Sequence, residues 1–310
     1  MTSHLARLIT GDALAQLKSL ASASINCCVT SPPYWQLRDY GVKGQLGLEK
    51  TPEEYVSKLV KVFEEVRRVL KADGTLWLNL GDTYASDWPS PRRNIMGNGS
   101  MKQGSRKFRP SRLGTLKDKD LVGIPWRVAF ALQRSGWYLR SDIIWQKPDP
   151  MPESVKDRPT RSHEYVFLFA KSHRYLYNVD AIREPHLAES LKKLTSPWKG
   201  SKCRGMAAGN QTLRPSQSCH PLGRNKRTVW TIPVAGYRGA HFSVFPEKLV
   251  EPCILAGCPK EGTVLDPFAG VGTTLLVASQ LGRNSIGIEI NDKYVRMAKE
   301  RMETLEPGAG

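Results

Sequence analysis

The chain has 310 residues, 40% hydrophobic and 24% charged, a composition that supports a sizeable core and excludes fibrous and globally disordered proteins. Lysine and arginine total 46 against 29 acidic residues, and the net charge of +17 predicts attraction to a polyanion, with nucleic acid the first candidate. No apolar run reaches the roughly 18 residues of a membrane span, no secretory signal is recognisable, and six cysteines do not make a disulfide scaffold, so we expect a soluble cytoplasmic protein.

Apolar runs alternate with helical patterns along the first half of the chain, which predicts an α/β fold with a mostly parallel sheet. Residues 25–30 (INCCVT) are expected to form a buried strand, with Cys27 and Cys28 as core thiols. Thr51 and Glu54 indicate a helix start with a capping box. In this half we predict helices at residues 51–70 and 121–135 and strands at residues 25–30, 75–80, 141–145 and 165–170.

Two stretches interrupt this rhythm and hold much of the positive charge. Residues 85–119 are rich in Pro, Gly, Ser and Asn and are predicted to form a mobile basic loop, and residues 172–228 interleave basic and aromatic side chains. A nucleic-acid surface needs charge gathered in this way, although a pair of solvated basic loops is the alternative. The side chains expected to contact DNA are Arg92, Arg93, Arg106, Lys107, Arg109, Lys202, Arg204, Arg224, Lys226 and Arg227.

The α/β pattern resumes in the last third of the chain around a glycine-rich motif. We predict helices at residues 246–256 and 292–305, a strand that begins at residue 263, a helix through residue 281, and a strand at residues 285–290. The sequence DPFAGVGTT, residues 266–274, follows the first of these strands. Such a turn at the carboxyl end of a parallel strand is where ligands bind in doubly wound sheets.

The ligand at this turn is predicted to be a nucleoside without phosphates. Neither GxGxxG nor a P-loop is present, and Glu289 at the end of the next strand is placed to accept hydrogen bonds from ribose hydroxyls. S-adenosylmethionine fits these features, and Asp266 could then hold its ammonium group. A generic turn is the plain alternative for the glycine sequence taken by itself.

A second motif, TSPPY at residues 30–34, follows the strand at 25–30. Its prolines lack N–H donors, so their carbonyls serve as rigid acceptors, and Tyr34 offers a flat face for a base. Ser31 and the Pro32 carbonyl could together accept hydrogen bonds from one NH₂ group. Such acceptors favour the tetrahedral geometry that frees the amine lone pair for attack on a methyl group.

The two motifs together resemble those of the DNA amino-methyltransferases, the N4-cytosine and N6-adenine enzymes of bacterial and phage modification systems. The catalytic tetrapeptide comes first, the basic region second and the FxGxG motif last, an order that looks like the β-group permutation of that family. Further family-like segments are Gly11-Asp12, GTLWLNLGD at 74–82, RSDIIWQKP at 140–148 and HFSVFPEKLV at 241–250. The resemblance implies a Rossmann-like S-adenosylmethionine-dependent methyltransferase fold with a mixed, mostly parallel sheet and an inserted target-recognition region.

The resemblance also implies a division of the chain and a role for each motif residue. Residues 1–171 would form the catalytic half of one domain, residues 172–228 the target-recognition region and residues 229–310 the cofactor-binding half. The target base would be held by Ser31, Pro32, Pro33 and Tyr34. S-adenosylmethionine would be bound by Asp12, Asp266, Phe268, Ala269, Gly270, Gly272, Thr273, Thr274 and Glu289. No metal site is expected.

The implied function is sequence-specific methylation of double-stranded DNA, with the target base flipped out of the duplex. Serine in the first motif position points within this family to the N4 amine of cytosine, and N6-adenine is the alternative. A catalytically inactive nucleic-acid-binding relative, an RNA or protein methyltransferase and a small-molecule methyltransferase are further alternatives. A C5-cytosine enzyme needs a nucleophilic cysteine, commonly after a proline in a loop. It is disfavoured because the only Pro-Cys pair in the sequence, Pro252-Cys253, lies on a predicted helix. The resemblance also implies a nucleoid-associated monomer or homodimer, with a cognate restriction endonuclease as a candidate partner.

Overall fold

The computed structural model describes residues 5–85, 115–187, 189, 220–234 and 245–303. The chain divides into two compact units, one formed by Met1–Tyr177 with Thr228–Gly310 and the other by Asn178–Arg227. The larger unit contains an eight-stranded sheet in the order β1-β8-β7-β2-β3-β5-β4-β6. In the smaller unit, the described residues include a short 3₁₀ helix, η2 (Asp180–Ile182), and an isolated bridge between Glu184 and Arg224.

The sheet is mixed and mostly parallel, as predicted. β5 runs antiparallel to both of its neighbours, β3 and β4, and the other five strand pairs are parallel. The strands are β1 (Ala6–Thr10), β2 (Ile25–Thr30), β3 (Leu70–Leu80), β4 (Tyr138–Gln146), β5 (His163–Ala170), β6 (Val229–Thr231), β7 (Thr263–Asp266) and β8 (Asn284–Glu289).

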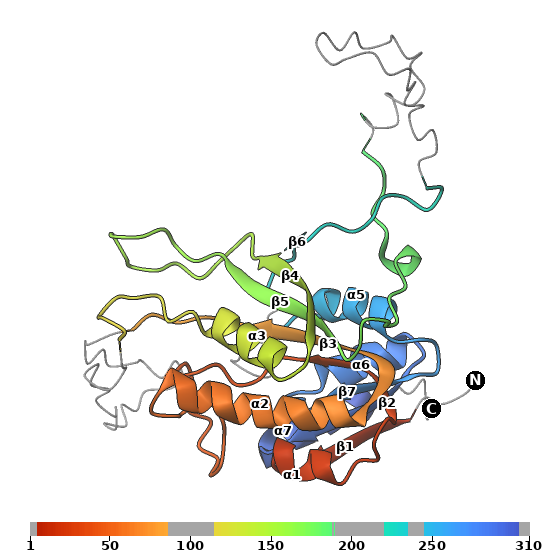
Figure 1. Ribbon diagram of the computed structural model, residues 1–310, viewed down its shortest axis with the longest axis horizontal. Coiled ribbons are helices and arrows are strands. Elements are labelled where there is room, and N and C mark those ends of the chain that lie inside the picture. Colours follow the sequence, from red (N-terminus) through yellow and green to blue (C-terminus); the bar gives the residue numbers. More distant parts are fainter. Residues whose placement is uncertain (1–4, 86–114, 188, 190–219, 235–244, 304–310) are drawn as a thin grey trace. The chain divides into compact units, whose positions relative to one another are not determined.

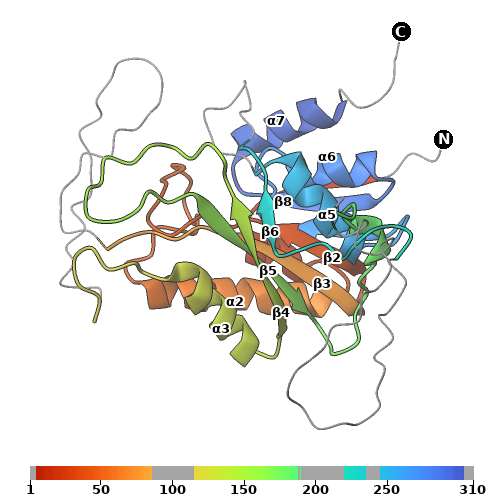
Figure 2. The ribbon, with the colours of Figure 1, turned by 90° about the horizontal axis from the view of Figure 1, so that it is seen from above.

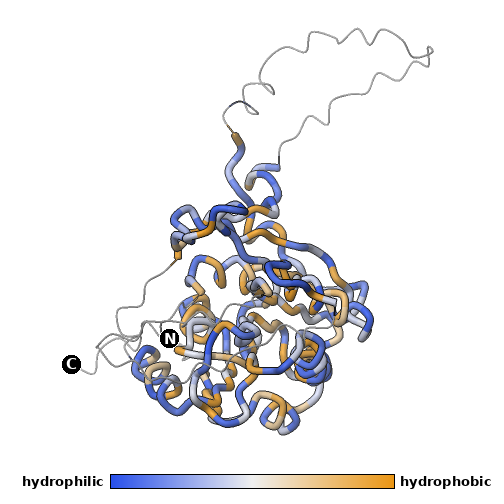
Figure 3. The backbone as a smooth tube through the Cα atoms, turned by 90° about the vertical axis from the view of Figure 1, so that its left-hand side faces the viewer, coloured by the Kyte–Doolittle hydropathy of each residue, from blue (hydrophilic) through white to orange (hydrophobic). Residues whose placement is uncertain are grey.

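Helices cover both faces of the sheet (Figures 1 and 2). One layer contains α1 (Ala13–Lys18), α2 (Pro52–Val69) and α3 (Ile124–Arg134), and the other contains α5 (Glu247–Gly257), α6 (Thr273–Gln280) and α7 (Asp292–Glu303). Hydrophilic and hydrophobic residues are interspersed along the chain (Figure 3), and α2 buries one face, whereas most of α6 is buried. In the described part of the chain, no helix has the length and apolar character needed to cross a membrane.

The core lies between α2 and the sheet. Tyr55, Leu59, Phe63 and Val66 recur at helical spacing and are fully buried. Burial of each such side chain stabilises the fold by roughly 1.5–3 kcal/mol. Cys27 and Cys28 on β2 are also buried, so their prediction as core thiols is confirmed.

Several predicted elements differ from the structure at their ends. The short strand β1 and helix α1 were not predicted, because β1 is partly exposed and its sequence carries no continuous apolar run. β3 begins at Leu70 and runs through Gly74, whereas the predicted strand began at residue 75. α3 begins only at Ile124, because Gly123 adopts a left-handed conformation with a φ of 77°.

The predicted capping box of α2 is only partly formed. Thr51 Oγ1 accepts a hydrogen bond from the backbone N–H of Glu54, as expected. The Glu54 carboxylate, however, accepts from the N–H of Lys50 at 3.0 Å and not from that of Thr51. The Glu54 side chain therefore pairs with the backbone N–H of Lys50, the residue before the N-cap Thr51.

The parallel strands bring the two sequence motifs to one edge of the sheet. β1, β8, β7 and β2 are consecutive in the sheet and all run in the same direction. The residues that follow them, including the SPPY and FAGVG segments, therefore gather at the edge formed by the carboxyl ends of the strands, where doubly wound folds bind ligands.

Candidate functional site

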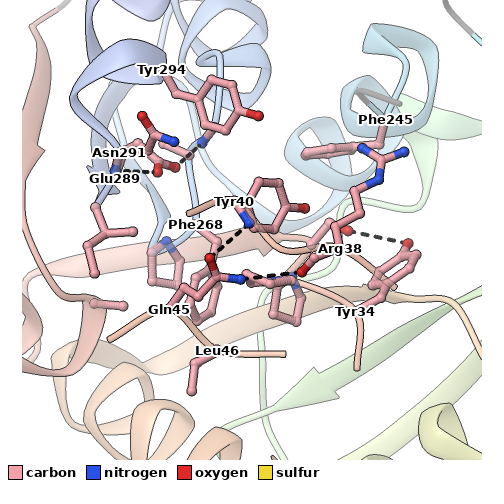
Figure 4. Close-up of a pocket in the computed structure, with 18 of the residues that line it drawn as sticks. Tyr34, Arg38, Tyr40, Gln45, Leu46, Phe245, Phe268, Glu289, Asn291 and Tyr294 are labelled. Atoms are coloured by element: carbon pink, nitrogen blue, oxygen red, sulfur yellow. Dashed lines mark hydrogen bonds between the residues drawn. The ribbon is translucent and has the colours of Figure 1, made fainter. Parts of the chain in front are cut away.

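A cavity of about 230 Å³ opens at this edge of the sheet. Its wall brings together most of the residues that the sequence singled out. Those in the wall are Asp12, Ser31, Pro32, Pro33, Tyr34, Phe268, Ala269, Gly270, Thr273 and Glu289. Figure 4 shows side chains from both motifs around the same space, with Tyr34 on one side and Phe268 and Glu289 on the other.

The glycine-rich turn is tied to the neighbouring strand by Glu289. Its carboxylate accepts hydrogen bonds from the N–H groups of Gly270 and Asn291, each at 2.8 Å (Figure 4). Burial raises the pKa of Glu289, and these backbone hydrogen bonds offset part of that rise. Glu289 thus holds the glycine-rich turn in place, and the same residue lines the cavity.

The two glycines of the turn serve different purposes. Gly270 has a φ of 53° and lines the cavity, and a Cβ atom added there would meet nothing within 4 Å. Gly272 has a φ of 77° and lies outside the wall; a Cβ atom there would come within 3.0 Å of the Ala298 Cβ. Gly272 therefore permits the left-handed start of α6 and close packing on α7.

Asp266 departs from its expected position. Its side chain is fully buried below the turn and is absent from the cavity wall, so it does not face a ligand ammonium group. Its carboxylate instead accepts hydrogen bonds from Thr30 Oγ1 and Thr274 Oγ1, both at 2.6 Å, and from Phe268 N at 3.0 Å. Thr274 is likewise buried and lies outside the wall. These two predicted ligand residues thus hold the turn and do not form its surface.

Asp12 lines the cavity from the carboxyl end of the neighbouring strand β1. Its Oδ1 atom accepts a hydrogen bond from Ala15 N at 2.9 Å and so caps helix α1. The preceding residue, Gly11, donates its N–H to the Glu289 carbonyl at 2.8 Å. This backbone bond joins the ends of β1 and β8, next to which the two acidic residues of the cavity wall lie.

The SPPY segment is held in place by contacts of the Tyr34 ring and by a hydrogen bond to helix α2. A Cβ atom on Gly81 would lie 2.5 Å from Tyr34 Cε2, so the absence of a side chain at Gly81 makes room for the ring. The Pro33 carbonyl accepts a hydrogen bond from the Tyr55 hydroxyl at 2.8 Å. One of the two proline carbonyls expected as free acceptors is therefore already used by the fold.

A polar network adjoins Ser31 that sequence reasoning did not single out. Ser31 Oγ lies 3.1 Å from Asn79 Oδ1, and the Tyr34 hydroxyl lies 2.6 Å from Glu164 Oε2. Lys147 forms an ion pair with Glu164, and all three unpredicted residues line the cavity. A sequence signal did exist for Asn79, which interrupts the apolar run at the end of β3 (LWLNL), where an unpartnered polar group would be costly. Glu164 lies next to His163 at the start of β5 and carries no such signal.

The two tryptophans considered as base-stacking residues differ in position. Trp35 is buried outside the cavity wall, and its Nε1 donates to the Glu49 carbonyl. Trp145 lines the cavity, and the Lys147 ammonium lies 4.5 Å from its ring centroid. Cys253 lies inside α5 and is buried, which agrees with the argument against a C5-cytosine nucleophile.

Most of the predicted DNA-contacting residues fall outside the described residues. These are Arg92, Arg93, Arg106, Lys107, Arg109, Lys202 and Arg204. The other three, Arg224, Lys226 and Arg227, lie in the smaller unit around one carboxylate, with nitrogen atoms 3.2, 3.8 and 3.2 Å from Glu184 oxygens. The Arg227 side chain is 66% exposed and is the most accessible of the three.

The buried carboxyl of Asp266 predicts a pH-dependent stability. Burial raises its pKa from the usual 3.8 to about 6, despite three hydrogen bonds that favour the charged form. As pH rises from about 4 to 6, the unfolded chain releases this proton before the folded chain does, so the free energy of unfolding falls. We expect Asp266→Asn to remove about 1–3 kcal/mol of this fall. Urea unfolding at several pH values checks this, and parallel curves for the two proteins would contradict it.

The comparisons with known proteins agree with this architecture. A family model described as DNA methylase matches residues 25–300. The Type II methyltransferases M.SmaI of Serratia marcescens and M.Cfr9I of Citrobacter freundii are each 45% identical to the chain. The alignments cover 96% of this chain in both cases and 90% and 88% of those proteins.

Two solved structures share the fold. A protein from Thermus thermophilus described as a DNA modification methylase, complexed with S-adenosyl-L-methionine, is 25% identical with a TM-score of 0.60 over 98% of this chain and 97% of that one. PvuII DNA methyltransferase (cytosine-N4-specific) is 21% identical with a TM-score of 0.65 over 100% and 89%. With the family match and the 45% identity over nearly full length, these findings show that the chain belongs to the N6/N4 family of S-adenosylmethionine-dependent DNA methyltransferases.

Proposed function

We propose that this Type II DNA methyltransferase transfers the methyl group of S-adenosylmethionine to the N4 amine of a cytosine flipped out of double-stranded DNA. The observation that carries the proposal is that Ser31 and Pro32 share one cavity with the Gly270 turn and Glu289, so that a methyl donor and an acceptor amine can meet there. Ser31 in the first motif position favours cytosine over adenine, and N6-adenine methylation is the alternative.

The cofactor side of the cavity fits a nucleoside. Gly270 leaves open space above its backbone, and the buried carboxylate of Glu289 lies in the same wall. The rings of Tyr40 and Tyr294 meet edge to face with centroids 6.1 Å apart beside it (Figure 4). We infer that Glu289 accepts hydrogen bonds from the ribose and that Asp12 lies toward the same nucleoside. Bound S-adenosylmethionine supplies an electrophilic methyl group on a sulfonium, whose thioether leaves without charge.

The chain's own contribution is orientation of the amine. We infer that Ser31 Oγ and the Pro32 carbonyl accept hydrogen bonds from the two amine hydrogens. The nitrogen lone pair, which is otherwise delocalised into the base, then points toward the cofactor side. The nitrogen forms its new bond to the methyl carbon as the carbon–sulfur bond breaks, and because the leaving thioether is neutral, no acid is needed to stabilise it. The methylated nitrogen, which then carries the positive charge, releases one of its two hydrogens as a proton to solvent when the product leaves the cavity. Catalysis therefore comes from holding the amine in this geometry while the cavity wall excludes water.

Delivery of the base requires a surface that binds duplex DNA. Extrusion of a base costs a few kcal/mol, which phosphate contacts elsewhere must offset. We propose that residues 172–228, with the basic residues around Glu184, form the target-recognition region. As a Type II methyltransferase, the enzyme protects the sites of a cognate restriction endonuclease.

The reaction product tests the proposal directly. Purified enzyme is incubated with labelled S-adenosylmethionine and whole-genome-amplified DNA, which carries no methylation, and the digested nucleosides are identified by mass spectrometry. We expect N4-methylcytosine. N6-methyladenine would preserve the mechanism and overturn the choice of base, and the absence of any methylated nucleoside would contradict the proposal.

Removal of the Ser31 hydroxyl tests its role as an acceptor. We expect Ser31→Ala to lower the single-turnover methylation rate by about 100-fold, because an amine acceptor at the reacting nitrogen is lost. Cofactor affinity, measured by calorimetry, should stay within about threefold, since Ser31 belongs to the base side of the cavity. An equal loss of rate and cofactor affinity would show that the two sides of the cavity are not separate.

Filling the space above Gly270 tests the position of the cofactor. Asparagine tolerates left-handed backbone, so Gly270→Asn adds a side chain with little strain, and we expect at least a ~10-fold weaker dissociation constant for S-adenosylmethionine. Gly41→Asn is the matched control: Gly41 has a φ of 71°, also has nothing within 4 Å of an added Cβ atom, and lies outside the cavity wall. Calorimetry that finds both variants equal to wild type would place the cofactor elsewhere.

A further inference from the structure

We propose that Glu164 is a positioning residue that sets the direction of the hydrogen bonds around Ser31, so that the serine hydroxyl accepts from the target amine. The inference rests on the proposed function. It assigns a task to the Asn79–Glu164–Lys147 group, which the amine-holding mechanism does not itself use.

The group is built across three strands of the sheet. Asn79 lies on β3, Glu164 on the adjacent antiparallel strand β5, and Lys147 directly after β4. Asn79 is 3% exposed, and the side chains of Glu164 and Lys147 are 15% and 20% exposed. The ion pair with Lys147 compensates the Glu164 charge in this largely covered position.

The direction of each bond follows from the chemistry of Glu164. A carboxylate has acceptors only, so Asn79 must present its amide N–H group to Glu164 Oε2, at 3.2 Å. The same Nδ2 atom donates to the Tyr165 carbonyl at 3.1 Å, and a backbone carbonyl is likewise only an acceptor. These two bonds turn the carbonyl oxygen of the Asn79 side chain toward Ser31.

The position of the Ser31 proton is then determined. Asn79 Oδ1 carries no hydrogen, so in their 3.1 Å contact Ser31 must be the donor. The Tyr34 hydroxyl donates to Glu164 Oε2 at 2.6 Å and also lies 3.0 Å from Asn79 Oδ1. Its longer contact with Ser31, 3.4 Å, places the single Ser31 proton between Asn79 Oδ1 and the Tyr34 oxygen. In both contacts the Ser31 proton points into the network, which leaves the oxygen lone pairs available to the cavity.

This arrangement matters because a serine hydroxyl can rotate. A freely rotating Ser31 would present its proton to the cavity for part of the time. In that orientation it could not accept a hydrogen bond from the target amine, because both groups would be donors. Through Asn79 and Tyr34, Glu164 restricts the rotation of the Ser31 hydroxyl before the base binds. The reaction step therefore does not have to include the loss of this rotational entropy.

The first test changes the carboxylate into an amide. Glu164→Gln keeps the size of the side chain but introduces an N–H₂ group that can reverse the network. We expect the single-turnover methylation rate on amplified, unmethylated DNA to fall by about 10- to 100-fold, the usual range for a lost charge-assisted hydrogen bond. Calorimetric affinity for S-adenosylmethionine should stay within about threefold, which also verifies that the variant is folded.

The second test separates bond direction from charge pairing. In the double variant Asn79→Asp with Glu164→Gln, the carboxylate and the amide exchange places. The carboxylate introduced on β3 then accepts hydrogen bonds from both Ser31 and the amide introduced on β5, although the bond that Asn79 donated to the Tyr165 carbonyl at 3.1 Å is lost and the rescue is therefore only partial. Ser31 is again a pure acceptor toward the cavity, although the ion pair with Lys147 is lost. We expect this double variant to methylate at least ~5-fold faster than Glu164→Gln. A structural or charge-pairing role for Glu164 would give no such rescue.

A matched control uses another carboxylate outside the cavity wall. Glu153 pairs with Arg158 at 2.6 Å and is also partly buried, so we expect Glu153→Gln to methylate within about threefold of wild type. A wild-type rate for Glu164→Gln, or a double variant no faster than Glu164→Gln, would overturn the inference while leaving the proposed function intact. If wild-type enzyme methylates no exocyclic amine, the proposed function fails, and the inference fails with it.

Discussion

One buried carboxylate connects the two halves of the candidate site. Asp266 ends β7, where the cofactor-side turn begins, and Thr30 ends β2, directly before Ser31. The 2.6 Å bond between them crosses 236 residues of sequence, and the bonds to Thr274 and Phe268 hold the start of α6 and the turn to the same group. Any displacement of one motif relative to the other would break a hydrogen bond between two fully buried polar groups, which is costly.

The same constraint explains an apparent contradiction in the electrostatics of the site. Burial alone would keep Asp266 uncharged, and the three donors favour its ionised form, yet desolvation is the larger effect and the pKa rises to about 6. At neutral pH the folded protein therefore bears the desolvation cost of a buried, ionised Asp266 carboxylate, which forms hydrogen bonds with residues next to both motifs. Glu289 repeats the principle one strand away, with its carboxylate bound by backbone N–H groups and its pKa raised by burial.

The side of the cavity around Ser31 is organised by hydrogen bonds of fixed direction. Tyr34 fits only because Gly81 has no side chain, and its hydroxyl is directed to Glu164. Asn79 receives its orientation from Glu164 and the Tyr165 carbonyl. Groups on or directly after β2, β3 and β5 therefore surround Ser31, and because the sheet fixes their spacing, the base binding that we propose would require little reorganisation.

The sequence by itself determined the fold class, the family and the motif residues that line the cavity. Continuous apolar strands, helical spacing and strand-end motifs are local signals, and INCCVT-SPPY and TVLD-PFAGVG each contain a strand and the turn that follows it. Local signals also placed Cys253 on a helix. They could not show β1, whose partly exposed sequence has no pattern of its own and which is ordered only by pairing with β8.

Tertiary structure alone decided what each polar residue does. Asp266 and Glu289 are both acidic residues at strand ends, but only the packing of α6 and β2 around Asp266 turns it away from the cavity. Asn79, Lys147 and Glu164 are separated by up to 85 residues, and it is strand order, with β5 inserted antiparallel between β3 and β4, that brings them beside Ser31. Spacing along the chain encodes local structure, whereas burial and hydrogen-bond direction depend on neighbours that only the folded sheet supplies.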